Sequence, residues 1–198
     1  MLIDLQRLIE RAYGIEPVPD VRTFLLSDPA VAEALAPMSS TAREALLVRQ
    51  QGEDLELSLY LDPADLQELS GEQPGLDCLM RAVEGISHFV LLVWRARRGR
   101  PVSLLELELQ AEVDKFVVGC LAQVGTAEEL VDTLFARARL RDNLTEEERR
   151  RYTAASELAR TYCRALPDLG SHEFLRDLRR FWRFGQPGKV SHIARLAA

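Results

Sequence analysis

Apolar residues recur every three or four positions over most of this chain, which is the spacing that places them on one face of an α-helix. Leu2, Leu5 and Leu8 begin the pattern, and Gly14 ends it with a residue that suits a helix C-terminus. Proline after an acidic N-cap, and threonine three residues before glutamate, indicate where other helices begin. Together these patterns predict helices at about 1–13, 29–35, 63–69, 76–98, 127–140, 146–165 and 171–184, with another long helix ending near 121.

An alternating pattern stands in the N-terminal third of the chain. Residues 45–49 and 55–61 are two apolar runs separated by 50–54, which include a glycine. One face of the second run carries Leu55, Leu57, Leu59 and Leu61. Two such runs around a short loop predict a β-hairpin at about 44–61. Residues 21–26 fit either a short strand or the start of a helix.

These elements define an α+β protein that is predominantly α-helical. An isolated hairpin is barely stable, so its leucine face should pack on helices. The strongest interruption of the pattern is the sequence Ser-Gly-Glu-Gln-Pro-Gly at 70–75. We therefore expect a small N-terminal α+β unit over 1–73 packed on a C-terminal helical bundle over 74–198, with one continuous domain as the alternative.

Composition argues for a folded protein that does not span a membrane. Hydrophobic residues make up 47% of the 198 positions and charged residues 28%, which is ordinary for a globular protein. The most apolar segment, 83–94, contains Glu84 and His88 and is shorter than the ~20 residues of a membrane span. The N-terminus carries Asp4 and lacks the basic region of a signal peptide. Three widely spaced cysteines without a Cys-x-x-Cys pair favour a reducing cytoplasm.

Charge is distributed unevenly along the chain. The net charge is −6, but residues 1–94 carry −10 and residues 95–198 carry +4. Arginine supplies 23 of the 25 cations, which is typical of a GC-rich bacterial genome. An acidic protein binds nucleic acid poorly unless it has a local basic patch, so nucleic acid is not the expected partner.

One group of polar residues interrupts the most apolar part of the chain. Two long helices on either side of the turn at 98–101 should fold back on each other, so that residues whose numbers sum to about 200 lie opposite. This places His88 near Glu112 and brings Glu84 and Glu108 to the same region. These four residues could form a metal or acid–base site, because facing helices build such sites from carboxylates and imidazoles.

The spacing of these residues departs from known metal-site patterns. A di-iron helix needs Glu-x-x-His and a zincin helix needs His-Glu-x-x-His, whereas Glu84 and His88 stand four positions apart with Gly85 where the general base belongs. A degenerate zincin-like hydrolase is therefore the alternative. The favoured interpretation is structural: a carboxylate holds the histidine at the edge of the core, and Arg81 and Arg95 neutralise the other acids. No metal or other cofactor is expected.

The last helix predicted from the pattern has two unlike faces. Its apolar face carries Phe174, Leu178, Phe181 and Trp182. Its basic face carries Arg176, Arg179, Arg180 and Arg183. Large apolar residues at helical spacing usually belong to the core, so we expect the aromatic face to be buried. The arginines then either meet the acidic N-terminal half or contact a partner.

The sequence shows no set of nucleophile, base and orienting group, and it has only three histidines. We therefore expect a cytoplasmic bacterial protein without catalytic activity that binds another protein, or a second copy of itself, through the four arginines. Adaptor, regulator and subunit of a complex all fit this expectation. The first alternative is a metal-binding or zincin-like protein that uses Glu84, His88, Glu108 and Glu112. The second is a nucleic-acid-associated factor that uses the arginine-rich helix.

Overall fold

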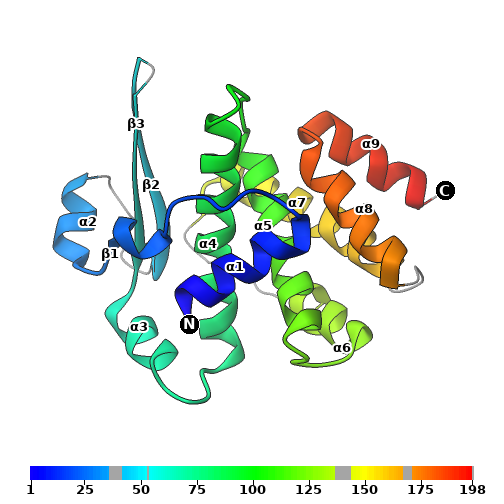
Figure 1. Ribbon diagram of the computed structural model, residues 1–198, viewed down its shortest axis with the longest axis horizontal. Helices are drawn as coiled ribbons and strands as arrows, with labels where there is room; N and C mark the ends of the chain where they lie inside the picture. Colours follow the sequence, from blue (N-terminus) through cyan, green and yellow to red (C-terminus); the bar gives the residue numbers. More distant parts are fainter. Residues whose placement is uncertain (36–41, 53, 137–143, 167–170, 198) are drawn as a thin grey trace.

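Two long antiparallel helices form the centre of the molecule (Figure 1). Helix α4 (Leu76–Ala96) and helix α5 (Leu104–Leu121) are joined by a turn at Gly99, whose φ of 58° suits glycine. This computed structural model describes residues 1–35, 42–52, 54–136, 144–166 and 171–197. The architecture is α+β and predominantly helical, as the sequence predicts.

Side chains pair across α4 and α5 in the expected register. Ser87 donates a hydrogen bond to Asp114, and Arg95 donates one to Glu106, so that the numbers of paired residues sum to about 200. The start of α5 is fixed by Ser103, whose hydroxyl accepts a hydrogen bond from a backbone N–H in the first turn.

Further helices lie around this central pair (Figure 1). Helix α1 (Leu2–Tyr13) crosses α4 and α5, and α7 (Glu146–Ala165) runs along α5. Helix α8 (Ser171–Arg183) contacts α1, and α9 (Gln186–Leu196) contacts α7 and α8. The first three of these agree with the sequence pattern, whereas α9 was not predicted.

The shorter helices follow their N-terminal capping residues. Helices α2 (Pro29–Leu35) and α3 (Pro63–Leu69) begin at prolines that follow aspartate. Helix α6 (Ala127–Val131) starts with the predicted capping box but continues as a π-helix, η2 (Asp132–Ala136), so its regular part is shorter than expected. The last part of the helix predicted there, 137–140, lies outside the described residues.

The sheet has three strands in the order β1-β3-β2. Strands β2 (Glu44–Gln51) and β3 (Asp54–Leu61) form the predicted antiparallel hairpin, and β1 (Leu25–Leu26) adds parallel to β3. The loop of the hairpin is shorter than expected, because Gln51 pairs with Asp54. Strand pairing therefore continues through positions that the sequence pattern assigned to the loop.

Residues 21–26 contain both of the structures that the sequence left open. Val21–Phe24 forms a 3-10 helix, η1, and the chain then enters β1. On the leucine face of β3, Leu59 and Leu61 are fully buried, while Leu55 and Leu57 near the hairpin tip are only partly buried. The hairpin therefore packs against helices through the half that lies away from its tip.

The β-hairpin meets α4 at Gly85, in the middle of the helix. A Cβ placed on Gly85 would lie 2.7 Å from Cδ1 of Leu59 and 3.0 Å from Cγ of Glu44. Both distances are shorter than ordinary carbon contacts, so the absence of a side chain at Gly85 permits this close packing.

One hydrophobic core includes buried residues from the hairpin, the central helices and the C-terminal part of the chain, such as Leu61, Phe89, Phe116 and Trp182. The division of the chain at residues 73–74 stays a prediction. Within the described segments, none of the helices combines the length and apolar character that crossing a bilayer requires.

Candidate functional site

His88 lies between two carboxylates that come from different elements. Its Nδ1 is 3.8 Å from Oε1 of Glu44, at the start of β2, and its Nε2 is 3.6 Å from Oε2 of Glu108 on α5. All three residues are buried. Oε1 of Glu108 lies a further 3.8 Å from Nε of Arg151 on α7. This cluster, the His88 clasp, connects the β-hairpin to three helices.

The pKa of His88 in the clasp is set by burial and by the two neighbouring acidic side chains. Burial by itself lowers the pKa of His88, but the carboxylates of Glu108 and Glu44 outweigh it, and the pKa is raised well above its ordinary value. Burial also raises the pKa of Glu44. Both distances to His88 exceed a normal hydrogen bond, so charge attraction is the main interaction. The raised pKa of His88 favours an imidazolium that faces the acidic side chains of Glu44 and Glu108.

The remaining candidate residues belong to a separate ion cluster. Nζ of Lys115 is 2.7 Å from Oε2 of Glu84 and 2.8 Å from Oε1 of Glu112. The four residues that the sequence brings together are thus divided into two groups. His88 pairs with Glu108 and Glu44 rather than with Glu112, whose carboxylate pairs with Lys115 instead.

This division matters for metal binding. A single ion cannot use both nitrogens of His88, which face different carboxylates, and oxygens of Glu84 and Glu112 already bind Lys115. The arrangement offers isolated ligands rather than the three or four convergent ones of a zinc site.

Another group of potential ligands lies near the start of α4. In the described part of the chain, Asp65, Glu68 and Cys78 are the group of three whose ligand atoms lie within 4.8 Å of one another. Arg81 donates two hydrogen bonds to Asp65, at 3.0 and 2.7 Å, instead of neutralising acids near His88. Burial raises the pKa of Cys78 to about 11, so its thiol is protonated at neutral pH. The carboxylate of Asp65, which binds Arg81, and the protonated thiol of Cys78 are therefore poor ligands for a cation.

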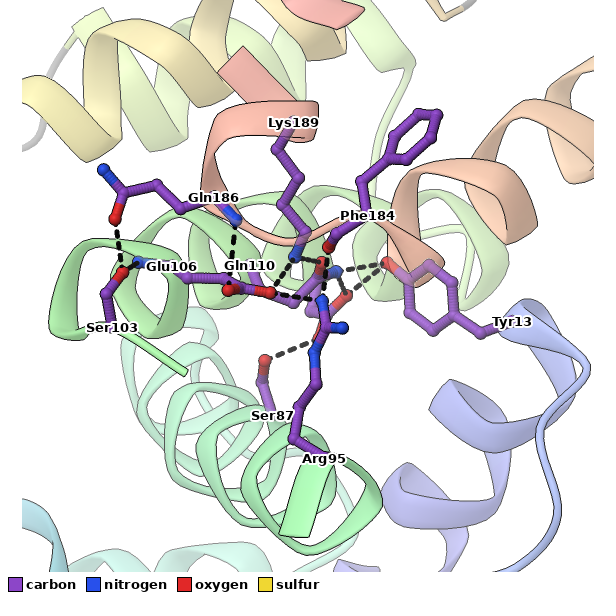
Figure 2. A network of polar contacts seen from close by, with 10 residues as sticks. Tyr13, Ser87, Arg95, Ser103, Glu106, Gln110, Phe184, Gln186 and Lys189 are labelled. Carbon is purple, nitrogen blue, oxygen red and sulfur yellow. Dashed lines mark hydrogen bonds and ion pairs between the residues drawn. The ribbon is translucent and has the colours of Figure 1, made fainter. Parts of the chain in front are cut away.

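The largest polar cluster lies inside the helical bundle (Figure 2). Asp114 on α5 is fully buried and accepts hydrogen bonds from the hydroxyls of Tyr13 and Ser87 and from Nε2 of Gln110. The hydrogen bonds from Ser87 and Gln110 measure 2.5 and 2.8 Å. Helices α1, α4 and α5 thus meet at one carboxylate.

Helix α9 contributes a lysine to the same cluster. Nζ of Lys189 donates a hydrogen bond of 2.6 Å to Oε1 of Gln110 and lies 3.6 Å from Oε1 of Glu106. Arg95 donates a 2.5 Å hydrogen bond to that same oxygen, and the backbone N–H of Gln186 donates to the other. Figure 2 shows the lysine and the arginine reaching this carboxylate from opposite helices.

Burial favours the neutral forms of Asp114 and Lys189 in this network. It raises the pKa of Asp114 to about 6, although hydrogen bonds from Ser87, Tyr13 and Gln110 oppose the shift. It lowers the pKa of Lys189 to about 8. Since these side chains are fully enclosed, the network can hold protons and fix helix positions, but it offers no surface to a substrate.

This network was not predicted from the sequence, although part of its pattern is visible there. Glu106, Gln110 and Asp114 stand at four-residue intervals and therefore share one face of α5. The predicted polar site used Glu108 and Glu112 on the neighbouring face instead. No local pattern could show that Tyr13 and Lys189 complete the network, because they lie far away in the sequence.

The basic face of α8 is exposed, and its apolar face is buried as expected. Leu178, Phe181 and Trp182 are completely buried, and Phe174 is partly buried. All four arginines of the opposite face are exposed, namely Arg176, Arg179, Arg180 and Arg183.

Three of these arginines contact residues in or next to α8, and Arg179 contacts the end of α1. Nη2 of Arg176 is 3.2 Å from Oε1 of Glu173, and Nε of Arg179 donates to the backbone carbonyl of Ala12 at 3.3 Å. Arg183 donates to the carbonyl of Arg179, and the guanidinium of Arg180 lies beside a phenylalanine ring. Within the described residues these arginines form no ion pair with the acidic N-terminal half, so that expectation is not met.

The chain matches no protein-family model, and neither the curated proteins nor the solved structures contain a significant match to it.

Proposed function

We propose that this protein works by binding another protein, and that the arginine face of α8 contacts an acidic surface of that partner. The observation that carries the proposal is the contrast between the two faces of α8. Its apolar face is buried in the core, with Trp182 stacked on Tyr13 at a centroid distance of 4.4 Å, while the four arginines of the other face are exposed. A fixed helix that presents cations loses little entropy on binding.

The guanidinium groups keep most of their donors for a partner. Each guanidinium has five N–H donors in a planar fork that matches a carboxylate. Arg176 forms an ion pair with Glu173 on the same helix. Such exposed pairs contribute only about 0–1 kcal/mol, so a partner carboxylate can replace Glu173. The face therefore suits a protein segment rich in aspartate and glutamate.

Nucleic acid is the weaker candidate because of the charge of the whole molecule. The net charge is −6, and residues 1–94 carry −10, so a long polyanion is repelled outside the arginine face. A metal-binding or zincin-like role has less support, since the carboxylates of Glu84 and Glu112 bind Lys115.

We further propose that the protein acts in a bacterial cytoplasm, as an adaptor, a regulator or a subunit of a complex. Its three cysteines are free thiols, which suits a reducing compartment. The arginine-rich composition supports a bacterial source.

The test compares two charge-reversed variants of the full chain. Arg180→Glu/Arg183→Glu changes the arginine face, and Arg149→Glu/Arg150→Glu changes two exposed arginines on α7 as a control of equal charge. Binding of a glutamate-rich peptide should weaken at least tenfold in the first variant and remain near wild type in the second. A wild-type chain that does not bind the peptide would contradict the proposal. Tighter binding to duplex DNA, with a steep dependence on salt, would favour the nucleic-acid role instead.

A further inference from the structure

Helix α9 is attached to the rest of the molecule largely through polar side chains. Three of its residues are buried: Lys189, His192 and Ile193. Lys189 reaches into the buried network, and Nε2 of His192 lies 3.0 Å from Oδ2 of Asp177 on α8. Ile193 is the aliphatic member of the three. By contrast, the inner face of α8 consists of large apolar side chains.

The surface beneath α9 has an aromatic centre. Tyr162 of α7 and Phe181 of α8 are stacked, with ring centroids 4.1 Å apart. The imidazole of His192 packs against both rings, at centroid distances of 6.0 and 6.2 Å. One carboxylate lies beside the rings, since Asp177 pairs with His192 and also accepts a hydrogen bond from Tyr162. Such a surface fits one amphipathic helix that presents polar, cationic and aliphatic groups.

The docking of α9 carries an energetic penalty. Burial of Lys189 disfavours its charge and lowers its pKa to about 8; Glu106 and Asp114 on α5 oppose this shift, and Arg95 on α4 adds to it. Arg95 and Lys189 also share one oxygen of Glu106. The hydrogen bond from Lys189 to Gln110 and the apolar burial of Ile193 and Leu196 must therefore offset the desolvation of a cation that shares its carboxylate with Arg95.

The connection between α8 and α9 is short, and it is held by hydrogen bonds from Arg95 to the carbonyl of Phe184 and from the N–H of Gln186 to Glu106, so release of α9 requires these bonds to break. The two helices are separated by Phe184 and Gly185, and a Cβ placed on Gly185 would meet no atom within 4 Å. Pro187 in the first turn of α9 prevents α8 from continuing as one helix, because proline lacks the N–H that the helix would need.

We propose that α9 is a detachable helix that occupies a helix-binding surface of its own chain, and that its release exposes this surface to an amphipathic helix of a partner. Local opening of this kind involves elements with few buried apolar contacts, and α9 is such an element. The inference is independent of the arginine face of α8, which lies on exposed residues.

Hydrogen exchange of the wild-type full chain tests the release directly. Amides of α9 should exchange at least tenfold faster than those of α8, and their exchange should depend little on low concentrations of urea, since only a small surface opens. Equal exchange rates with equal urea dependence in α8 and α9 would show that both open together, and would overturn the proposal.

A peptide of residues 185–197 tests the exposed surface. The variant Ile193→Asp should undock α9, while Ala194→Asp changes the adjacent exposed position and serves as the control. The Ile193→Asp chain should bind the labelled peptide at least tenfold more tightly than wild type or the control, because its own helix no longer competes. A peptide carrying Lys189→Glu should not bind. Absence of binding to the Ile193→Asp chain would reject the helix-binding surface.

Discussion

The substitution Gly85→Ala tests how closely the β-hairpin packs on α4. Gly85 lies inside a long helix, where alanine normally stabilises the helix by about 1 kcal/mol relative to glycine. A methyl group at this position, however, would lie 2.7 Å from Cδ1 of Leu59 and 3.0 Å from both Cγ and Oε1 of Glu44. Helix propensity and tertiary packing therefore predict opposite signs.

We expect packing to win. Leu59 is fully buried and cannot move into solvent, and Glu44 is held in the His88 clasp. Forcing an extra methyl into a closely packed site typically costs about 1–3 kcal/mol. Displacement of Glu44 also moves it away from the imidazolium of His88. After the gain in helix propensity, Gly85→Ala should lower the free energy of unfolding by up to about 2 kcal/mol.

Urea denaturation, followed by circular dichroism, provides the measurement. A double mutant separates the two effects: Leu59→Ala alone should cost about 2–5 kcal/mol because it leaves a cavity. In that background Gly85→Ala should cost at least about 1 kcal/mol less than in wild type, since the nearest clash is gone. If Gly85→Ala alone raises the stability of the protein, the close approach of hairpin and helix is refuted.

Three other predictions concern separate parts of the molecule. The ion pairs of the His88 clasp raise the pKa of His88, so they stabilise the fold below pH ~6.5, and this contribution falls as pH rises through the native pKa. His88→Gln should remove this pH dependence of the free energy of unfolding in urea titrations at several pH values. Parallel curves of stability against pH for wild type and variant would contradict the prediction. Gln123 has a φ of 55°, so Gln123→Gly should raise the free energy of unfolding by about 1 kcal/mol, which an unchanged urea midpoint would disprove. Trp182 is completely buried between aromatic rings, so Trp182→Ala should cost about 3–5 kcal/mol, whereas a wild-type midpoint would mean that α8 is not core.

The sequence determined the features that depend on residues near one another. The capping boxes at Thr126 and Thr145 set the starts of two helices, and alternating leucines identified the β-hairpin. The apolar face of α8 was predicted from helical spacing alone. Each of these patterns involves residues close together in the sequence, so it can be recognised from capping residues and hydrophobic periodicity alone. Even the opposition of α4 and α5 followed from one short turn.

Only the tertiary structure decided which polar residues meet. The sequence placed His88 opposite Glu112, but the hairpin brings Glu44 to it and α5 brings Glu108. The buried network depends on Tyr13 and Lys189, which are separated by most of the chain. A charged side chain can interact with water or with any partner of suitable geometry, so its neighbours in the sequence do not determine which partner it binds. Packing of the apolar faces fixes the positions of the helices, and those positions then select the polar contacts.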